Sequence, residues 1–156
     1  ASRGLGDVYK RQPMSWSRRQ ASAGFTTGVP YRALSSNVSL ANVEDQLQSS
    51  DSLLNFYRGM LKLRRDFPAL QTGTYALDQV SGLAMGFEKS KDAQRALVII
   101  NHATSSVNWT HQGLPADTTY VQQWPVAGQG LQHVTNGQGQ LQLSVPGQSL
   151  VVLVKP

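Results

Sequence analysis

The sequence predicts an α+β protein in which an irregular segment and one long amphipathic helix precede an antiparallel β-domain. Residues 13–42 are rich in Ser, Gly, Pro and Ala without sustained periodicity. Residues 51–67 carry apolar side chains at helical spacing, and short strand-like runs separated by polar turns follow Gly73. A single helix has too little around it to be its own domain, so we expect it to belong to a larger structure.

The irregular segment is expected to be an extended but structured loop. A loop of this length is uncommon in a compact domain unless it serves a site or wraps a partner surface. A short helical turn is expected after it, at residues 43–47.

The helix predicted over residues 51–67 has one face suited to a core, formed by Leu53, Phe56, Tyr57, Met60, Leu61 and Leu63. Ser50 or Asp51 can cap its start. Arg64 and Arg65 suit its negative C-terminal end, and Pro68 follows the expected stop.

Eight strands are predicted, at residues 74–77, 83–88, 96–101, 106–109, 120–124, 131–133, 140–145 and 149–154. The runs 97–100 and 150–154 are nearly all apolar, which predicts burial on both faces. The run 141–145 alternates apolar and polar residues, as a half-exposed strand does. The pattern is typical of a sandwich or barrel.

The composition excludes several classes of protein. Cysteine is absent, which excludes a disulfide framework, a thiolate metal site and a cysteine nucleophile. The net charge of +5 comes from scattered basic residues and not from a stripe interleaved with aromatics, so no nucleic-acid partner is expected. No run approaches the ~18 apolar residues of a membrane span, so we expect a soluble, cytoplasmic protein without a membrane partner.

Residues 1–12 are expected to be non-native. The segment 7–12, DVYKRQ, can be back-translated to a sequence that resembles the mosaic-end adapter of transposase-based sequencing libraries, and such segments are left out of fold reasoning. The alternative is a genuine basic N-terminal arm.

Few residues outside the helix invite a functional interpretation. His102, His111 and His133 are isolated and are expected at the surface or at strand edges, with no HExxH motif and no G-x-S-x-G elbow nearby. Trp109 and Trp124 lie at strand ends, where a core position is expected; the alternative is a platform for stacking sugar rings. No metal or cofactor is expected.

Four ordered stretches carry a family resemblance. Residues 13–16 (PMSW) resemble the end of the RTPMQW motif, and residues 23–28 (AGFTTG), 42–46 (NVEDQ) and 51–58 (DSLLNFYR) resemble three further motifs. Together they resemble α-glucosidases, oligo-1,6-glucosidases and trehalose synthases of the α-amylase family, glycoside hydrolase family 13. Arg11 would align with the arginine of RTPMQW, but Gln12 stands at its threonine and Ser15 at its glutamine.

With residues 1–12 set aside as non-native, the resemblance implies two parts: the last βα loop and final helix of a (β/α)8 barrel at 13–70, and a C-terminal β-sandwich at 71–156. It implies an oligosaccharide substrate, bound mainly by barrel residues that this sequence lacks. Trp16 and Phe25 would help to shape the sugar pocket; the alternative is that both pack the loop onto the barrel.

The resemblance assigns no catalytic residue to this sequence. Glycosidic cleavage normally uses two carboxyl groups roughly 5 to 10 Å apart, and the family's catalytic acids all precede the RTPMQW motif. Glu44 and Asp45 are adjacent near a helix start, where acids favour the helix dipole. We expect a retaining α-glucosidase whose C-terminal part, taken alone, is inactive.

Three alternatives stay open from the sequence. The parent could be a trehalose synthase or another transferase or isomerase of the same family. The chain could instead be a carbohydrate-binding β-module, or a structural domain whose exposed helix face docks a partner.

Overall fold

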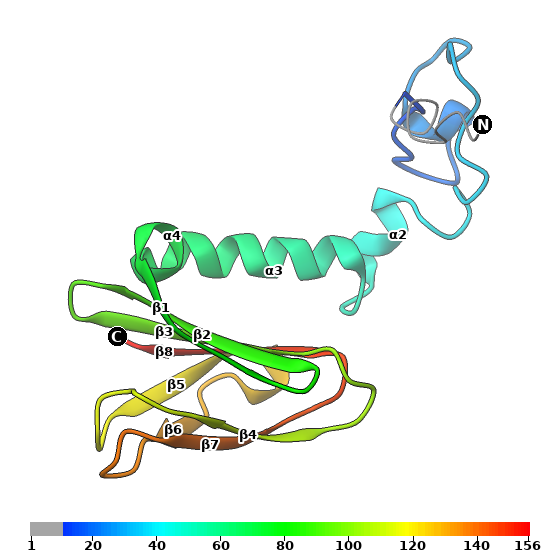
Figure 1. The fold of residues 1–156 in the computed structure, drawn as a ribbon. Coiled ribbons are helices and arrows are strands. Elements are labelled where there is room, and N and C mark those ends of the chain that lie inside the picture. Colours follow the sequence, from blue (N-terminus) through cyan, green and yellow to red (C-terminus); the bar gives the residue numbers. More distant parts are fainter. Residues whose placement is uncertain (1–10) are drawn as a thin grey trace, which may run out of the picture. The chain divides into compact units, whose positions relative to one another are not determined.

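The computed structural model describes residues 11–156, so the larger part of the expected non-native segment 1–12 lies outside the described residues. The chain divides into two compact units, one extending to Leu61 and the other running from Lys62 to Pro156 (Figure 1). None of the helices within residues 11–156 is long and apolar enough to cross a membrane.

The first unit is mostly irregular, as expected, and contains the 3-10 helix η1 (Ala21–Gly24) and the helix α2 (Val43–Gln48). The predicted helical turn at 43–47 is confirmed. Asn42 begins α2, because its Oδ1 accepts a hydrogen bond from the amide of Asp45 at 3.0 Å. Its Nδ2 donates to the carbonyl of Val38 at 3.0 Å, so the same side chain ties the helix to the preceding loop.

The long helix α3 (Leu53–Asp66) starts later than its predicted cap. Ser52, and not Ser50 or Asp51, accepts a hydrogen bond from the amide of Asn55, at 3.2 Å. The amide of Leu54 is satisfied by Oε1 of Gln46, at 3.0 Å. These two bonds leave residues 50 and 51 in the connection between α2 and α3.

The end of α3 lies where the sequence predicts it, because the helix stops at Asp66 and Pro68 follows. Arg64 and Arg65 do lie in its last turn. Pro68 does not simply end the helix, however, since it is the first residue of a further short helix, α4 (Pro68–Thr72). Proline suits this position because its fixed φ matches the helix and its missing N–H needs no partner.

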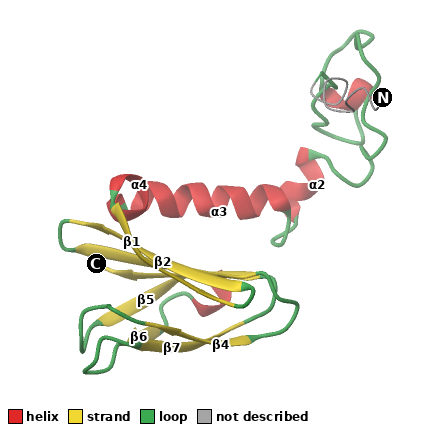
Figure 2. Cartoon of the chain, viewed as in Figure 1, coloured by secondary structure: helices red, strands yellow, loops and turns green. Residues whose placement is uncertain are grey.

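The second unit contains all eight predicted strands. Six form one antiparallel sheet in the order β1 (Thr74–Ser81), β2 (Ala84–Lys91), β3 (Gln94–Asn101), β8 (Ser149–Lys155), β5 (Thr119–Trp124) and β6 (Gln132–Val134). The strands β4 (Val107–His111) and β7 (Leu141–Val145) form a second, two-stranded sheet. Figure 2 shows this pair beneath the larger sheet, which gives the predicted sandwich.

The central strands β3 and β8 are covered on both faces, which confirms the prediction from their apolar runs. Towards the small sheet, Leu97, Ile99 and Leu153 join a core with Trp109 and Leu141. On the opposite face, a second cluster contains Ala96, Val152 and Val154 from the sheet, Ala69 of α4, and the partly buried Leu63 and Phe67.

Strand β7 shows the alternation that the sequence predicts. Leu141 and Val145 are fully buried, while the polar residues Gln142 and Ser144 are exposed. The strand therefore has one face in the core and one face in solvent.

Candidate functional site

The loop that carries the predicted site residues is closed by backbone hydrogen bonds. The amides of Trp16 and Ser17 both donate to the carbonyl of Ala23, at 2.9 and 3.1 Å, and the amide of Phe25 donates to that of Ser22 at 3.0 Å. Trp16 and Phe25 thus lie at the base of one tight loop. Both side chains are about half exposed, at 51% and 49%.

Gly24 allows this loop to close. Its φ of +71° lies in the left-handed region that glycine adopts without strain. A Cβ at this position would lie 2.9 Å from Oε1 of Gln20 and 3.3 Å from the Cβ of Trp16. A larger residue here would therefore force Trp16 and Gln20 apart.

The loop is fixed to the start of α2. The amides of Val43 and Glu44, which have no partner within the helix, donate to the carbonyls of Ser15 and Trp16 at 3.0 and 2.9 Å. The position of Trp16 is therefore set by the first turn of this helix.

Charged side chains support the same junction. Nη1 of Arg19 lies 2.8 Å from Oε1 of Glu44, whose other oxygen accepts a hydrogen bond from the hydroxyl of Ser17. Nε of Arg18 lies 3.1 Å from Oδ2 of Asp45. Both acids occupy the first turn of α2, as predicted, but their arginine partners could not be predicted from the sequence.

A cavity of about 290 Å³ lies beside this junction. It is lined by residues 12–15, by Ser35 and Asn37 of the long loop, and by the start of α2. The lining mixes polar and apolar side chains, and none of them carries a charge. Within residues 11–156, no group of three His, Asp or Glu side chains is arranged to hold a metal ion.

The histidines do not all lie where the sequence suggested. His111 is fully buried, which corrects the prediction that it lies at the surface or at a strand edge. The alternation of β4 places it inside, because Val107, Trp109 and His111 share the core side of the strand. Burial lowers the pKa of His111 to about 4 and also lowers the pKa of the half-buried His133. His102 is exposed, as expected.

The tryptophans of the β-domain occupy core positions, as predicted. Trp109 is only 3% exposed and belongs to the core between the sheets, and Trp124 packs against the second cluster. The ring face of Trp109 is therefore not free to stack on a sugar.

A buried charged network in the β-domain is the main feature that the sequence analysis missed. Glu88 is 2% exposed, and its two carboxylate oxygens accept hydrogen bonds from the phenol of Tyr120, at 3.0 Å, and from Nη1 of Arg95, at 2.8 Å. Burial and the adjacent carboxylate raise the pKa of Tyr120. The spacing of residues in β2 could have indicated that Glu88 is buried. Ala84, Gly86 and Glu88 are every second residue of the strand and share its inward side.

Comparison with known proteins connects the loop to a family. Residues 3–73 match the model of the α-amylase catalytic domain, a range that contains Trp16, Phe25 and the whole of α3. The chain is 30% identical over 100 residues to an oligo-1,6-glucosidase of Heyndrickxia coagulans, covering 64% of this chain and 18% of that protein. It is 45% identical over 60 residues to an α-glucosidase of Candida albicans, covering 38% of this chain and 10% of that protein.

Solved structures extend the likeness through the β-domain. An isomaltulose synthase from a Klebsiella species matches 93% of this chain with a TM-score of 0.66 and 25% identity. The isomaltulose synthase SmuA from Protaminobacter rubrum matches 92% with a TM-score of 0.64 and 26% identity. In both cases the match covers 25% of the solved chain.

These matches support a place for the chain in the α-amylase family. Among the members of that family it is similar to the oligo-1,6-glucosidases. The chain spans less than a fifth of the length of the first of these relatives.

Proposed function

We propose that this chain is the C-terminal part of a retaining enzyme that cleaves α-glucosidic bonds of short oligosaccharides. The observation that carries the proposal is the family match over residues 3–73, supported by relatives that are oligo-1,6-glucosidases and α-glucosidases. In this proposal the loop at residues 13–28 borders the sugar site, because active sites of (β/α)8 barrels lie on the loops that follow the strands.

The carboxylates described in residues 11–156 support a catalytic site elsewhere in the longer polypeptide. Glu44 and Asp45 are each engaged by an arginine, and Glu88 lies inside the sandwich with Arg95 and Tyr120. A glycosidase uses two carboxyl groups that flank the bond it cleaves, whereas each of these three carboxylates is held by an arginine. We therefore expect the chain by itself to be inactive.

Trp16 and Phe25 are proposed as residues that shape the sugar pocket. Both are half exposed on a loop whose backbone is closed by hydrogen bonds and fixed to α2. A rigid aromatic side chain with an open face suits contact with a sugar ring, since it offers apolar area at little entropic cost.

The first experiment reads the genomic sequence upstream of the chain and expresses the longer enzyme. We expect it to release glucose from isomaltose or maltose, while the 156-residue chain releases none. Hydrolysis by the chain alone, or a gene that starts just ahead of Ala1, would overturn the proposal.

The same enzyme tests the loop residues. Trp16→Ala should raise the KM for the oligosaccharide about tenfold, which corresponds to about 1.4 kcal/mol of lost binding. Tyr31→Ala is the matched control, because Tyr31 is an aromatic residue of the same unit that is 92% exposed. An equal KM for both variants would mean that Trp16 only packs the loop.

An isomerase is the second candidate for the longer enzyme. The observation in its favour is that two structural relatives are isomaltulose synthases, and another solved relative is described in complex with its substrate sucrose. Incubation with sucrose discriminates the candidates: an isomerase forms a new disaccharide, whereas a glucosidase releases monosaccharides or leaves sucrose unchanged.

A further inference from the structure

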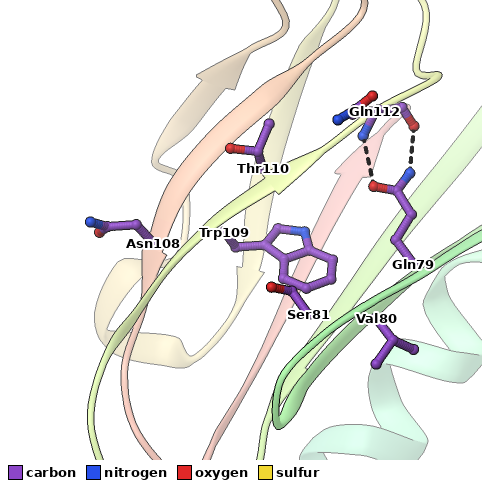
Figure 3. A pocket seen from close by; sticks show the side chains of 7 residues that line it. All are labelled: Gln79, Val80, Ser81, Asn108, Trp109, Thr110 and Gln112. Atoms are coloured by element: carbon purple, nitrogen blue, oxygen red, sulfur yellow. Dashed lines mark hydrogen bonds between the residues drawn. The ribbon is translucent and has the colours of Figure 1, made fainter.

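A second pocket lies in the β-domain, where the edge strand of the large sheet faces the small sheet. The pocket has a volume of about 420 Å³ and is lined by residues 79–81 at the end of β1, residues 108–110 of β4, and Gln112 (Figure 3). All of these residues belong to the second unit. No residue of the loop that carries Trp16 and Phe25 lines this pocket.

One wall of this pocket is fixed by a reciprocal pair of hydrogen bonds. Nε2 of Gln79 donates to the carbonyl of Gln112 at 2.8 Å, and the amide of Gln112 donates back to Oε1 of Gln79 at 3.1 Å (Figure 3). An irregularity in β1 between Ala76 and Gln79 precedes this contact. Irregularities of this kind at a sheet edge change the direction in which side chains point. Here the irregularity precedes Gln79, whose side chain links the edge strand β1 to Gln112, directly after β4.

Trp109 supplies a polar atom without a partner. The residue is 3% exposed, and its indole Nε1 has no hydrogen-bond acceptor among the described residues. Its indole lies among the pocket residues, with the nitrogen on the side of Gln79 and Gln112 in the view of Figure 3. The nitrogen itself has almost no accessible surface, so Trp109 forms part of the pocket wall and does not offer this N–H to a ligand.

The depth of the indole is set by Gly86 of β2. A Cβ at this position would lie 2.8 Å from Cζ2 of Trp109 and 3.2 Å from Nδ1 of His111. Only glycine lets the indole rest directly on β2, so the position of the unpaired N–H is a built feature of the sandwich.

The chemistry of the lining selects a neutral ligand rich in hydroxyl groups. The side chains are amides, hydroxyls, one indole N–H and one valine, and none carries a charge. A carboxylate, phosphate or ammonium group would find no counter-charge there, whereas a sugar hydroxyl both donates to and accepts from such groups. The volume lies within the range of about 300–1,000 Å³ that is typical of small-molecule sites.

We propose that this pocket binds one or two residues of a neutral oligosaccharide, through the amide and hydroxyl groups that line it beside the indole of Trp109. This second sugar site does not depend on the catalytic proposal.

The three tryptophans of the chain allow a direct test by two-dimensional ¹H–¹⁵N NMR, since each gives one indole signal. Maltose is added to the 156-residue chain up to about 50 mM, a range that detects a millimolar dissociation constant. We expect the Trp109 signal to shift saturably and the Trp124 signal to stay in place. A shift of the Trp16 signal would report on the loop instead, so the two proposals succeed or fail separately.

A pair of variants on β1 sharpens the test. Ser81→Val removes a hydroxyl that lines the pocket, and it should weaken maltose binding about threefold to tenfold, the effect of one neutral hydrogen bond. Thr74→Val is the control, because Thr74 is exposed at the other end of the same strand. The retained Trp124 signal shows that each variant is folded.

Three results would overturn the proposal. They are a Trp109 signal that does not move with maltose, an equal response to glycerol at the same concentration of hydroxyl groups, and equal weakening by the two variants. The first would mean that the pocket holds water only.

Discussion

Glu44 and Glu88 make the same kinds of contact in the two units of the molecule. Each carboxylate accepts one hydrogen bond from an arginine, at 2.8 Å in both cases, and one from a hydroxyl group. Their surroundings differ, because the side chain of Glu44 is 37% exposed and that of Glu88 is 2% exposed. Contact distances alone therefore do not show how strongly each pair holds the chain together.

The difference extends to the whole of the two units. The first unit is organised by hydrogen bonds and ion pairs at the start of α2, and α2 contains no fully buried side chain. The second unit has two apolar clusters, one on each face of the large sheet. Because apolar burial is the main favourable term in folding, we expect the β-domain to provide most of the stability of this chain.

The largest expected effect comes from removing the buried carboxylate. Glu88→Ala should lower the free energy of unfolding by about 3 kcal/mol, because it leaves Arg95 and the Tyr120 hydroxyl without their acceptor. Arg95 is one-third exposed and can partly rehydrate, which keeps the loss at the lower end for a broken buried pair. Urea denaturation followed by the fluorescence of the core tryptophans measures the change.

Tyr120→Phe serves as the matched control for this variant. It removes only one of the two hydrogen bonds and leaves the ion pair intact, so the expected loss is about 1 kcal/mol. Equal losses for the two variants would show that the charge of Glu88 contributes little beyond its bond to the phenol.

A second prediction concerns pH and the buried His111. Its folded-state pKa of about 4 lies below the unfolded value of 6.5, so the unfolded chain binds more protons between these limits. Stability is therefore fully present above about pH 6.5, falls as the pH is lowered towards 4, and is not lost further by this group below that. We expect a total loss of about 3 kcal/mol, measured as urea midpoints across this range.

His111→Phe should remove most of this pH dependence. Phenylalanine fills a similar volume without the two ring nitrogens, both of which are buried and lack partners among the described residues. His102→Gln is the control and should keep the full slope, since His102 is exposed. A smaller slope from His133, whose pKa is also lowered by burial, should remain in the His111 variant. An unchanged slope would exclude His111 as its source.

The secondary structure of the β-domain could be predicted because each strand carries its own signal. The apolar runs at 97–100 and 150–154 indicated strands buried on both faces, and the polar turns between runs marked the boundaries. The loop and α2 were also predictable. The predicted start of α3 was wrong, because its first free amides are satisfied by Gln46 and Ser52, through contacts that depend on how α2 precedes it.

Pairings between distant residues could not be predicted. Glu88 and Tyr120 are 32 positions apart and meet only because β2 and β5 lie in one sheet, with β3 and β8 between them. The pocket beside Trp109 depends likewise on β1 and β4 facing each other across the sandwich. The proposed role of Trp16 and Phe25 in a sugar pocket comes from the family motifs alone, since nothing in their local spacing indicates a sugar.

The smallest expected effect comes from the exposed carboxylate of the first unit. Glu44→Ala removes the acceptor of Arg19 and Ser17, and it should lower stability by about 0.5 kcal/mol or less, because exposed ion pairs are weakened by water and salt. Native-state hydrogen exchange at the amides of Val43 and Glu44, which hold the loop carbonyls, should quicken about twofold. Asp51→Ala is the control, since Asp51 only accepts from the neighbouring Ser50 hydroxyl. A loss of 2 kcal/mol or more, as for a buried pair, would mean that the loop junction is shielded from water in solution, and the contrast with Glu88 would then be lost.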